Sequence, residues 1–315
     1  MVHEDFSLSY YNNDPTQLIR QDIHDKWEPH FNIAKPVGKL TTTFKQEVLH
    51  SCELMYDAFK QYTPKINLFY SGGMDSECML RCFHQLKIPI NPIILVHHHH
   101  SDAKETVDAL KLCKSLSITP TIFNINLPAL YASGKLHELG LRYQTARMGM
   151  LELIYVLEHI QSPSILADDI QLVYTCSQAN LINRNETDYL QWFYEIREDE
   201  DGLYNRYEHL SGIPTIADSF RYTPQSWSAM ILTNHIKDIV LNDKGKASSY
   251  STKNAMMSKE FSVPYRDKTN VFVSGHHRGI ANRLRDELTP LLLPPTVIRI
   301  EYTELLRIFG VDYAV

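Results

Sequence analysis

The chain has 315 residues, of which 43% are hydrophobic and 22% are charged, and its formal net charge is −6. These fractions are typical of a globular protein and exclude a collagen-like, mucin-like or intrinsically disordered chain. The acidic balance argues against a nucleic-acid coat protein or a membrane-surface binder, because both need a basic surface.

Five cysteines are widely spaced along the chain: Cys52, Cys78, Cys82, Cys113 and Cys176. No C-x-x-C pair occurs, which argues against a zinc ribbon or a thioredoxin-like redox site. Free thiols indicate a reducing compartment. The polar N-terminus does not have the order of a secretory signal, and no window approaches 18 apolar residues. We therefore expect a cytoplasmic protein with no membrane partner.

Helices and strands are predicted to alternate from residue 41 onward. Apolar residues recur at helical spacing within residues 41–62. Six further elements follow in chain order: strand Ile66–Tyr70, helix 77–87, strand Pro89–Val96, helix Ala103–Leu116, strand Thr121–Ile125 and helix Leu141–Ile160, before a short strand Ser164–Leu166. This alternation favours a mainly parallel α/β sheet covered by helices on both faces.

The pattern is weaker on either side of this region. Residues 1–40 are interpreted as an N-terminal arm, residues 41–175 as the α/β domain and residues 176–315 as an irregular, mostly helical C-terminal region. Within the last region we expect the following elements: a polar connection over Asn180–Gly202, a helix over Ser226–Leu241, short strands at Val271–Ser274 and 297–302, and a short helix over 303–310.

The segment with the clearest chemistry is Ser71–Ser76, with the sequence SGGMDS, between a buried strand and a helix. Gly72 and Gly73 permit positive φ and a close approach of backbone N–H groups to an anion. The serine hydroxyls can donate to phosphate oxygens, and the following helix directs its N-terminus at the same point. Asp75 would repel a phosphate unless a cation lay between them, which indicates a Mg²⁺ ligand.

This motif is not a Walker A loop. It resembles the PP-loop of the N-type ATP pyrophosphatase superfamily, which is adenine nucleotide alpha hydrolase-like, over roughly residues 41–175. The resemblance implies a Rossmann-like (HUP-type) fold with ATP and Mg²⁺ as cofactors. It also implies attack on the α-phosphate of ATP, with the PP-loop holding the leaving pyrophosphate. The implied nucleotide-binding residues of this loop are Ser71, Gly72, Gly73, Met74, Asp75 and Ser76.

The strand end Val96–His100 is expected beside this loop. Similar proteins receive the adenine there, which makes Val96 and His97 candidates for adenine binding. A solvated strand end and a metal site are the two alternatives for the histidine run. Successive residues of a strand point to opposite faces, so one such run rarely encloses a metal alone.

Two further candidates follow later strands. In similar proteins a basic residue after the third strand faces the nucleotide phosphates. Arg142, Gln144 and Arg147 lie there, and we select Arg147 as the catalytic candidate beside Asp75. Asp169, in the pair that follows Ser164–Leu166, is a candidate second metal ligand. Ala167 stands where relatives carry a glycine, and a turn cap is the alternative for the aspartates.

A basic cluster, Ser274–Arg285, contains two histidines and three arginines in an otherwise acidic chain. It is interpreted either as closing over phosphates or an acidic substrate, or as a basic helix paired with surface carboxylates. We expect a small-molecule substrate, with tRNA as the alternative partner, and the chain is compatible with a homodimer. Trp192 and Trp227 are expected in the core.

Several branches of the superfamily are disfavoured by missing residues. Val2 replaces the cysteine of glutamine-hydrolysing relatives, and no cysteine follows Cys176 to form a zinc site or a reductase tail. The favoured function is an ATP-dependent adenylyl-forming ligase that activates a carboxylate or carbonyl oxygen for attack by a nucleophile. The alternatives are a sulfur-handling protein similar to ATP sulfurylase or sulfonucleotide reductase, and a non-catalytic nucleotide-binding protein.

Overall fold

The computed structural model describes residues 42–97, 104–167, 172–174, 192–197, 203–216, 219–233, 256–264, 275–292 and 297–301. Its centre is a five-stranded sheet in the order β3-β2-β1-β4-β7, and every neighbouring pair is parallel. The strands are β1 (Ile66–Phe69), β2 (Ile90–His97), β3 (Thr121–Ile125), β4 (Ser164–Leu166) and β7 (Thr215–Ile216). The predicted parallel α/β sheet is confirmed.

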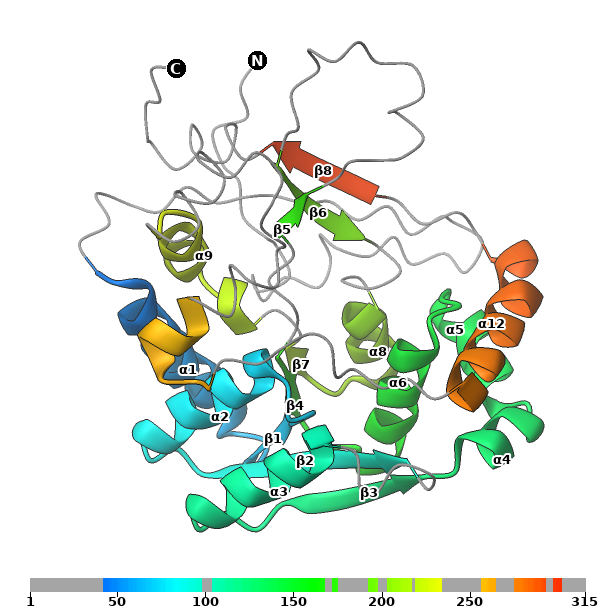
Figure 1. The fold of residues 1–315 in the computed structure, drawn as a ribbon, viewed down its shortest axis with the longest axis horizontal. Helices are drawn as coiled ribbons and strands as arrows, with labels where there is room; N and C mark the ends of the chain where they lie inside the picture. The colour runs from blue at the N-terminus through cyan, green and yellow to red at the C-terminus, as the bar shows by residue number, and fades with distance from the viewer. Residues whose placement is uncertain are drawn as a thin grey trace.

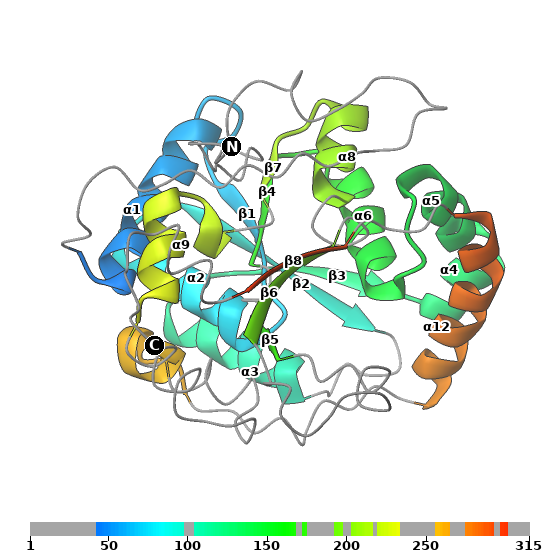
Figure 2. The ribbon, with the colours of Figure 1, turned by 90° about the horizontal axis from the view of Figure 1, so that it is seen from above.

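Helices cover both faces of this sheet, which gives three layers (Figures 1 and 2). The first face carries α1 (Phe44–Phe59), α2 (Met74–Gln85), α3 (Lys104–Ser115), α9 (Pro224–Ile231) and the helical residues 256–261. The second face carries α4 (Leu127–Ala132), α5 (Lys135–Tyr143), α6 (Met148–Ile160), α8 (Leu203–Ser211) and α12 (Gly275–Leu288). Two 3-10 turns, η2 (Ser219–Arg221) and η4 (Thr289–Leu291), complete the helical elements of the described residues.

The two faces of the central strands β1, β2 and β4 pack into separate cores, as the period of two requires. Ile66 and Leu68 of β1 lie in the core under α1 and α2, whereas Phe69 lies in the core under α5 and α6. On β2, Ile94 and Val96 belong to the first core and Ile93 to the second. This alternation determines which side chains at the end of β2 can contact the helices on each face of the sheet.

A second, smaller sheet contains the strand predicted at 297–302 and two strands that were not predicted. It is antiparallel, in the order β5-β6-β8, and consists of β5 (Leu172–Tyr174), β6 (Trp192–Arg197) and β8 (Val297–Glu301). Only four residues separate Ala167 from β5, so β5 begins near the carboxyl end of β4. Figure 1 shows this sheet apart from the helical layers, above the centre of the molecule.

Three predicted elements need correction. The helix expected over Leu141–Ile160 is two helices, because α5 ends at Tyr143 and α6 begins at Met148. The polar connection expected over Asn180–Gly202 contains the strand β6. The helix expected over Ser226–Leu241 ends at Ile231, since residues 232–233 are not helical.

A buried arginine explains the break between α5 and α6. Arg206 of α8 is only 3% exposed and donates from Nη1 to the carbonyl oxygens of Tyr143 (2.9 Å) and Gln144 (3.5 Å). Gln144 has φ 55°, the left-handed conformation that commonly ends a helix. The last carbonyls of α5 are therefore bound to α8, and the chain turns there to start α6.

The C-terminal residues contribute to the same cores as the earlier ones. Phe220, Met230 and Met256 pack with α1 and α2, while Ile280 and Leu284 of α12 pack with α4, α5 and α6. Residues on both sides of position 175 therefore share these cores. The arm 1–40, Val271–Ser274 and residues 303–310 lie outside the described residues. No described helix has both the length and the apolar character needed to cross a membrane.

Candidate nucleotide site

The loop Ser71–Gly73 joins β1 to α2 at the point where the chain reverses its course across the sheet. From β1 the chain adds β2 and β3 on one side and then returns to place β4 on the other side. All these strands are parallel, so their carboxyl ends meet at one edge. Open α/β sheets bind ligands in the crevice outside the strands at such a switch point.

Two serines line this loop. Ser71 Oγ and Ser76 Oγ lie 3.1 Å apart, and the N–H of Gly73 donates to Ser71 Oγ at 3.1 Å. Ser76 Oγ also donates to the carbonyl oxygen of Gly73 at 3.2 Å. Ser71 is exposed, whereas Ser76 is 4% exposed. The hydroxyl groups are therefore held next to each other beside the first turn of α2.

Gly72 has no room for a side chain. Its φ is +80°, and a Cβ atom built there would lie 2.3 Å from the carbonyl oxygen of Glu105, in the first turn of α3. The loop thus packs directly on the backbone of α3. This contact accounts for a glycine at position 72 independently of any ligand, and it anchors the loop at the sheet edge.

The helix α2 begins immediately after the two glycines, with Gly73 as its N-cap. Asp75 lies half-buried in the first turn. Met74 is 4% exposed and packs into the first core, so only its backbone can face a ligand. The neighbouring carboxylate, Glu77, is 2% exposed and forms an ion pair with Arg81 (2.6 Å).

These residues fit a pyrophosphate with Mg²⁺. Adjacent hydroxyls, a glycine cradle and the N-terminus of a 12-residue helix supply donors for an anion. Mg²⁺ is usually held by one or two carboxylates together with substrate phosphates, a role that Asp75 can fill. The described residues contain no group of three or more His, Cys, Asp or Glu side chains arranged as a metal cage.

The end of β2 lies at the same sheet edge and extends beyond the end of β1. Phe69 pairs with Ile93, whereas His97 pairs with Ile125 at the end of β3. Val96 belongs to the first core. His97 lies on the opposite face of β2, the face that also carries Ile93 and Leu95. His98, His99 and His100 lie outside the described residues.

A buried carboxyl group lies beside His97. It was not among the predicted site residues. Glu152 of α6 is 5% exposed, and its Oε2 lies 3.8 Å from His97 Nε2. Burial raises the pKa of Glu152 to about 8. The available signal was a single acidic residue in the otherwise apolar run Met148–Leu157.

The other basic candidates separate into two groups. Arg147 is exposed at the N-cap of α6, which places it at the sheet edge about one and a half helical turns from Glu152. Arg142 instead pairs with Glu158 at 2.9 Å, and Gln144 donates to the carbonyl oxygen of Leu141 at 2.7 Å. A contact of Arg147 with the nucleotide phosphates stays a prediction.

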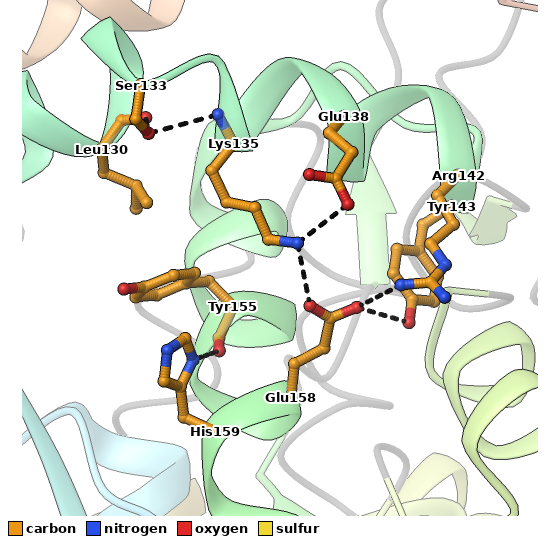
Figure 3. A network of polar contacts seen from close by, with 9 residues as sticks. All are labelled: Leu130, Ser133, Lys135, Glu138, Arg142, Tyr143, Tyr155, Glu158 and His159. Carbon is orange, nitrogen blue, oxygen red and sulfur yellow. Dashed lines mark hydrogen bonds and ion pairs between the residues drawn. The ribbon is translucent and has the colours of Figure 1, made fainter.

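Figure 3 shows the network that holds Arg142. Glu158 of α6 accepts hydrogen bonds from Arg142 and from Tyr143 Oη (3.2 Å), and it pairs with Lys135 (3.4 Å). Lys135 also contacts Glu138 at 2.9 Å. The network joins α5 to α6 toward the C-terminal end of α6, so its role is structural.

The basic cluster forms the helix α12. Ile280, Leu284 and Leu288 are buried at helical spacing, while Arg278, Arg283 and Arg285 are exposed. Arg285 lies 3.7 Å from Asp286, and Tyr131 of α4 donates to Glu287 at 2.7 Å. The side chains of Trp192 and Trp227 and all of Asp168 and Asp169 lie outside what the structure describes.

The raised pKa of Glu152 predicts a pH-dependent stability. In an unfolded chain a glutamate ionises at about pH 4.3. In the folded chain Glu152 keeps its proton to about pH 8. Between these values, raising the pH ionises only the unfolded chain, which lowers the free energy of unfolding by about 1.4 kcal/mol per pH unit. Glu152→Gln should therefore gain stability over the wild type from pH 5 to pH 8, measured by urea unfolding.

The matched control for this prediction is Glu158→Gln on the same helix, which changes a carboxylate of the network in Figure 3. Its difference from the wild type should not grow between pH 5 and pH 8 as that of Glu152→Gln does. Parallel pH profiles for the wild type and Glu152→Gln would contradict the prediction.

Comparisons with known proteins give structural likeness only. No family model matches the chain, and no curated protein matches it. Solved structures similar to it include NMN synthetase from Francisella tularensis (17% identity, 78% of this chain and 94% of that chain, TM-score 0.35). A second is a predicted tRNA methyltransferase subunit from Methanocaldococcus jannaschii (11% identity, 66% of this chain and 95% of that chain, TM-score 0.31). A third is NH3-dependent NAD synthetase from Campylobacter jejuni (18% identity, 79% of this chain and 97% of that chain, TM-score 0.31).

TM-scores this low add nothing to what the residues of this chain establish. The chain itself carries the SGGMDS loop on a parallel, Rossmann-like sheet, between β1 and α2. It resembles the PP-loop superfamily in both respects.

Proposed function

We propose that this chain is an ATP-dependent adenylyl-forming ligase. The observation that carries the proposal is the loop at the switch point, where Ser71 and Ser76 lie 3.1 Å apart beside the N-terminus of α2. Such a site suits a pyrophosphate group, because hydroxyls, backbone N–H groups and the helix dipole all favour an anion. An enzyme that releases pyrophosphate from ATP needs this stabilisation on the leaving group.

The proposed reaction divides the site between leaving group and nucleotide. A substrate oxygen attacks the α-phosphorus of ATP, the bond from that phosphorus to the bridging oxygen breaks, and pyrophosphate leaves with the electron pair. Ser71, Ser76 and the backbone of Gly72 and Gly73 hold the departing oxygens. A nucleophile then displaces AMP from the activated substrate.

Charge on the leaving group needs a positive partner. Mg²⁺, when bound, neutralises that charge and fixes the orientation of the phosphates. Asp75 is the proposed ligand from the loop, and Asp169, after β4, is the proposed second ligand. Arg147, exposed at the start of α6, is proposed to contact the phosphates. Val96 and His97 are proposed to receive the adenine.

The test is pyrophosphate release from α-labelled ATP with Mg²⁺, with identification of the nucleotide product. The assay is run with separate pools of amino acids, small carboxylates and tRNA; the three exposed arginines of α12 justify the tRNA pool. We expect AMP and pyrophosphate together with one pool only, and that pool identifies the substrate class. ATP binding without pyrophosphate release in any pool would favour the non-catalytic alternative, and release of a nucleoside phosphosulfate with added sulfate would favour the sulfur-handling one.

A further inference from the structure

A polar pair lies between two apolar layers at the end of β2. His97 is the last residue of β2 and Glu152 lies in the second turn of α6, with Nε2 and Oε2 3.8 Å apart. Their side chains are 25% and 6% exposed. The pair thus joins the end of one central strand to a helix that begins at the same edge of the sheet.

The surroundings of Glu152 are apolar. Its neighbours along α6, Leu151 and Ile154, are fully buried in the second core. Burying a carboxyl group there lowers stability, because the charged form loses its hydration. A leucine or methionine would pack at this position without that cost. Residues that lower the stability of a fold commonly contribute to a functional site.

The position of His97 indicates which part of the site the pair serves. β2 continues past the end of β1, so its last residues flank the PP-loop from the side on which α6 begins. His98, His99 and His100 follow directly in sequence. An imidazole held against α6 fixes this strand end, and with it the backbone groups next to His97.

We propose that Glu152 is a positioning residue of the nucleotide site, which holds His97 so that the end of β2 can receive the base of the nucleotide. This inference rests on the proposed function, since it assigns the base end of ATP to β2 and the phosphate end to Ser71–Ser76. Glu152 acts through His97 and does not itself touch the phosphates.

The experiment compares two probes, ATP and inorganic pyrophosphate, both with Mg²⁺, by calorimetric titration of the full chain. Glu152→Ala should weaken ATP binding about tenfold, because the polar contact that holds His97 is lost, and leave pyrophosphate binding unchanged. His97→Ala should have the same effect. Glu152→Gln, which keeps a polar side chain of the same length beside His97, should bind ATP more tightly than Glu152→Ala.

Glu158→Gln is the matched control, because it alters a carboxylate of the same helix within the network of Figure 3. It should change neither affinity. Unchanged ATP binding by Glu152→Ala, or an equal loss for ATP and pyrophosphate, would overturn the positioning role. A wild-type protein that binds neither probe would instead overturn the proposed function, and the inference with it.

Discussion

Asp75→Asn is expected to reduce Mg²⁺-dependent pyrophosphate release at least about 100-fold, since even residues that only support a metal ligand cost 10–100-fold when replaced. Asparagine keeps the size of the side chain in the first turn of α2 but removes the charge. In the presence of EDTA the same variant should bind ATP as well as the wild type or better, because a carboxylate repels phosphate when no cation lies between them. This reversal between the two conditions separates a metal ligand from a structural residue.

The matched control for Asp75→Asn is Asp57→Asn on α1. Asp57 is exposed and pairs with Lys60 at 2.6 Å, so the control makes the same chemical change at the surface. It should leave turnover and ATP binding unchanged. Unaltered turnover by Asp75→Asn, or equal losses of ATP binding with Mg²⁺ and with EDTA, would exclude the assigned role.

Gly72→Ala is expected to lower the free energy of unfolding by about 3 kcal/mol or more and to abolish ATP and pyrophosphate binding. Two effects add at this position. The residue has φ +80°, and its new Cβ would lie 2.3 Å from the carbonyl oxygen of Glu105. Because the obstacle is backbone, the loop or α3 must move, which displaces Ser71. Urea unfolding and calorimetric titration measure the two consequences.

Gly134→Ala isolates the contribution of the backbone conformation. Gly134 has φ +75°, close to that of Gly72, but a Cβ built there meets nothing within 4 Å. We expect this control to cost only about 1–2 kcal/mol, the penalty of a left-handed conformation, and to bind ATP normally. Equal losses of stability at both positions would show that the packing of Gly72 on α3 contributes nothing.

Much of the α/β core could be predicted from the sequence because the signals there are local. The strand Thr121–Ile125 has the predicted bounds, and β1, β2 and β4 lie where short apolar runs between turn residues indicated. The strand–glycine–helix order around Ser71–Ser76 also follows from neighbouring residues. The four described cysteines, Cys52, Cys78, Cys82 and Cys113, are buried and free as expected.

The errors arose where a distant segment decides the local structure. The apolar period of α6 continues backward into α5, whereas α5 ends at the left-handed Gln144, where Arg206, more than 60 residues away, binds the last carbonyls. The strand β6 lies within residues 180–202, whose polar composition is typical of a loop. Its conformation comes from backbone pairing with β8, in which Glu195 is in register with Arg299. The periodicity of one segment carries no information about a partner in a distant segment, such as Arg206 for α5 or β8 for β6.

The sequence by itself determined the loop chemistry and the strand–helix order, because glycine, serine and aspartate act through backbone geometry and charge within six consecutive residues. Only the tertiary structure decided that Gly72 rests on the backbone of Glu105, that Arg142 pairs with Glu158, and that His97 meets Glu152. Each of these contacts joins two different helices, strands or loops that come together only in the folded chain, so no local pattern could specify it.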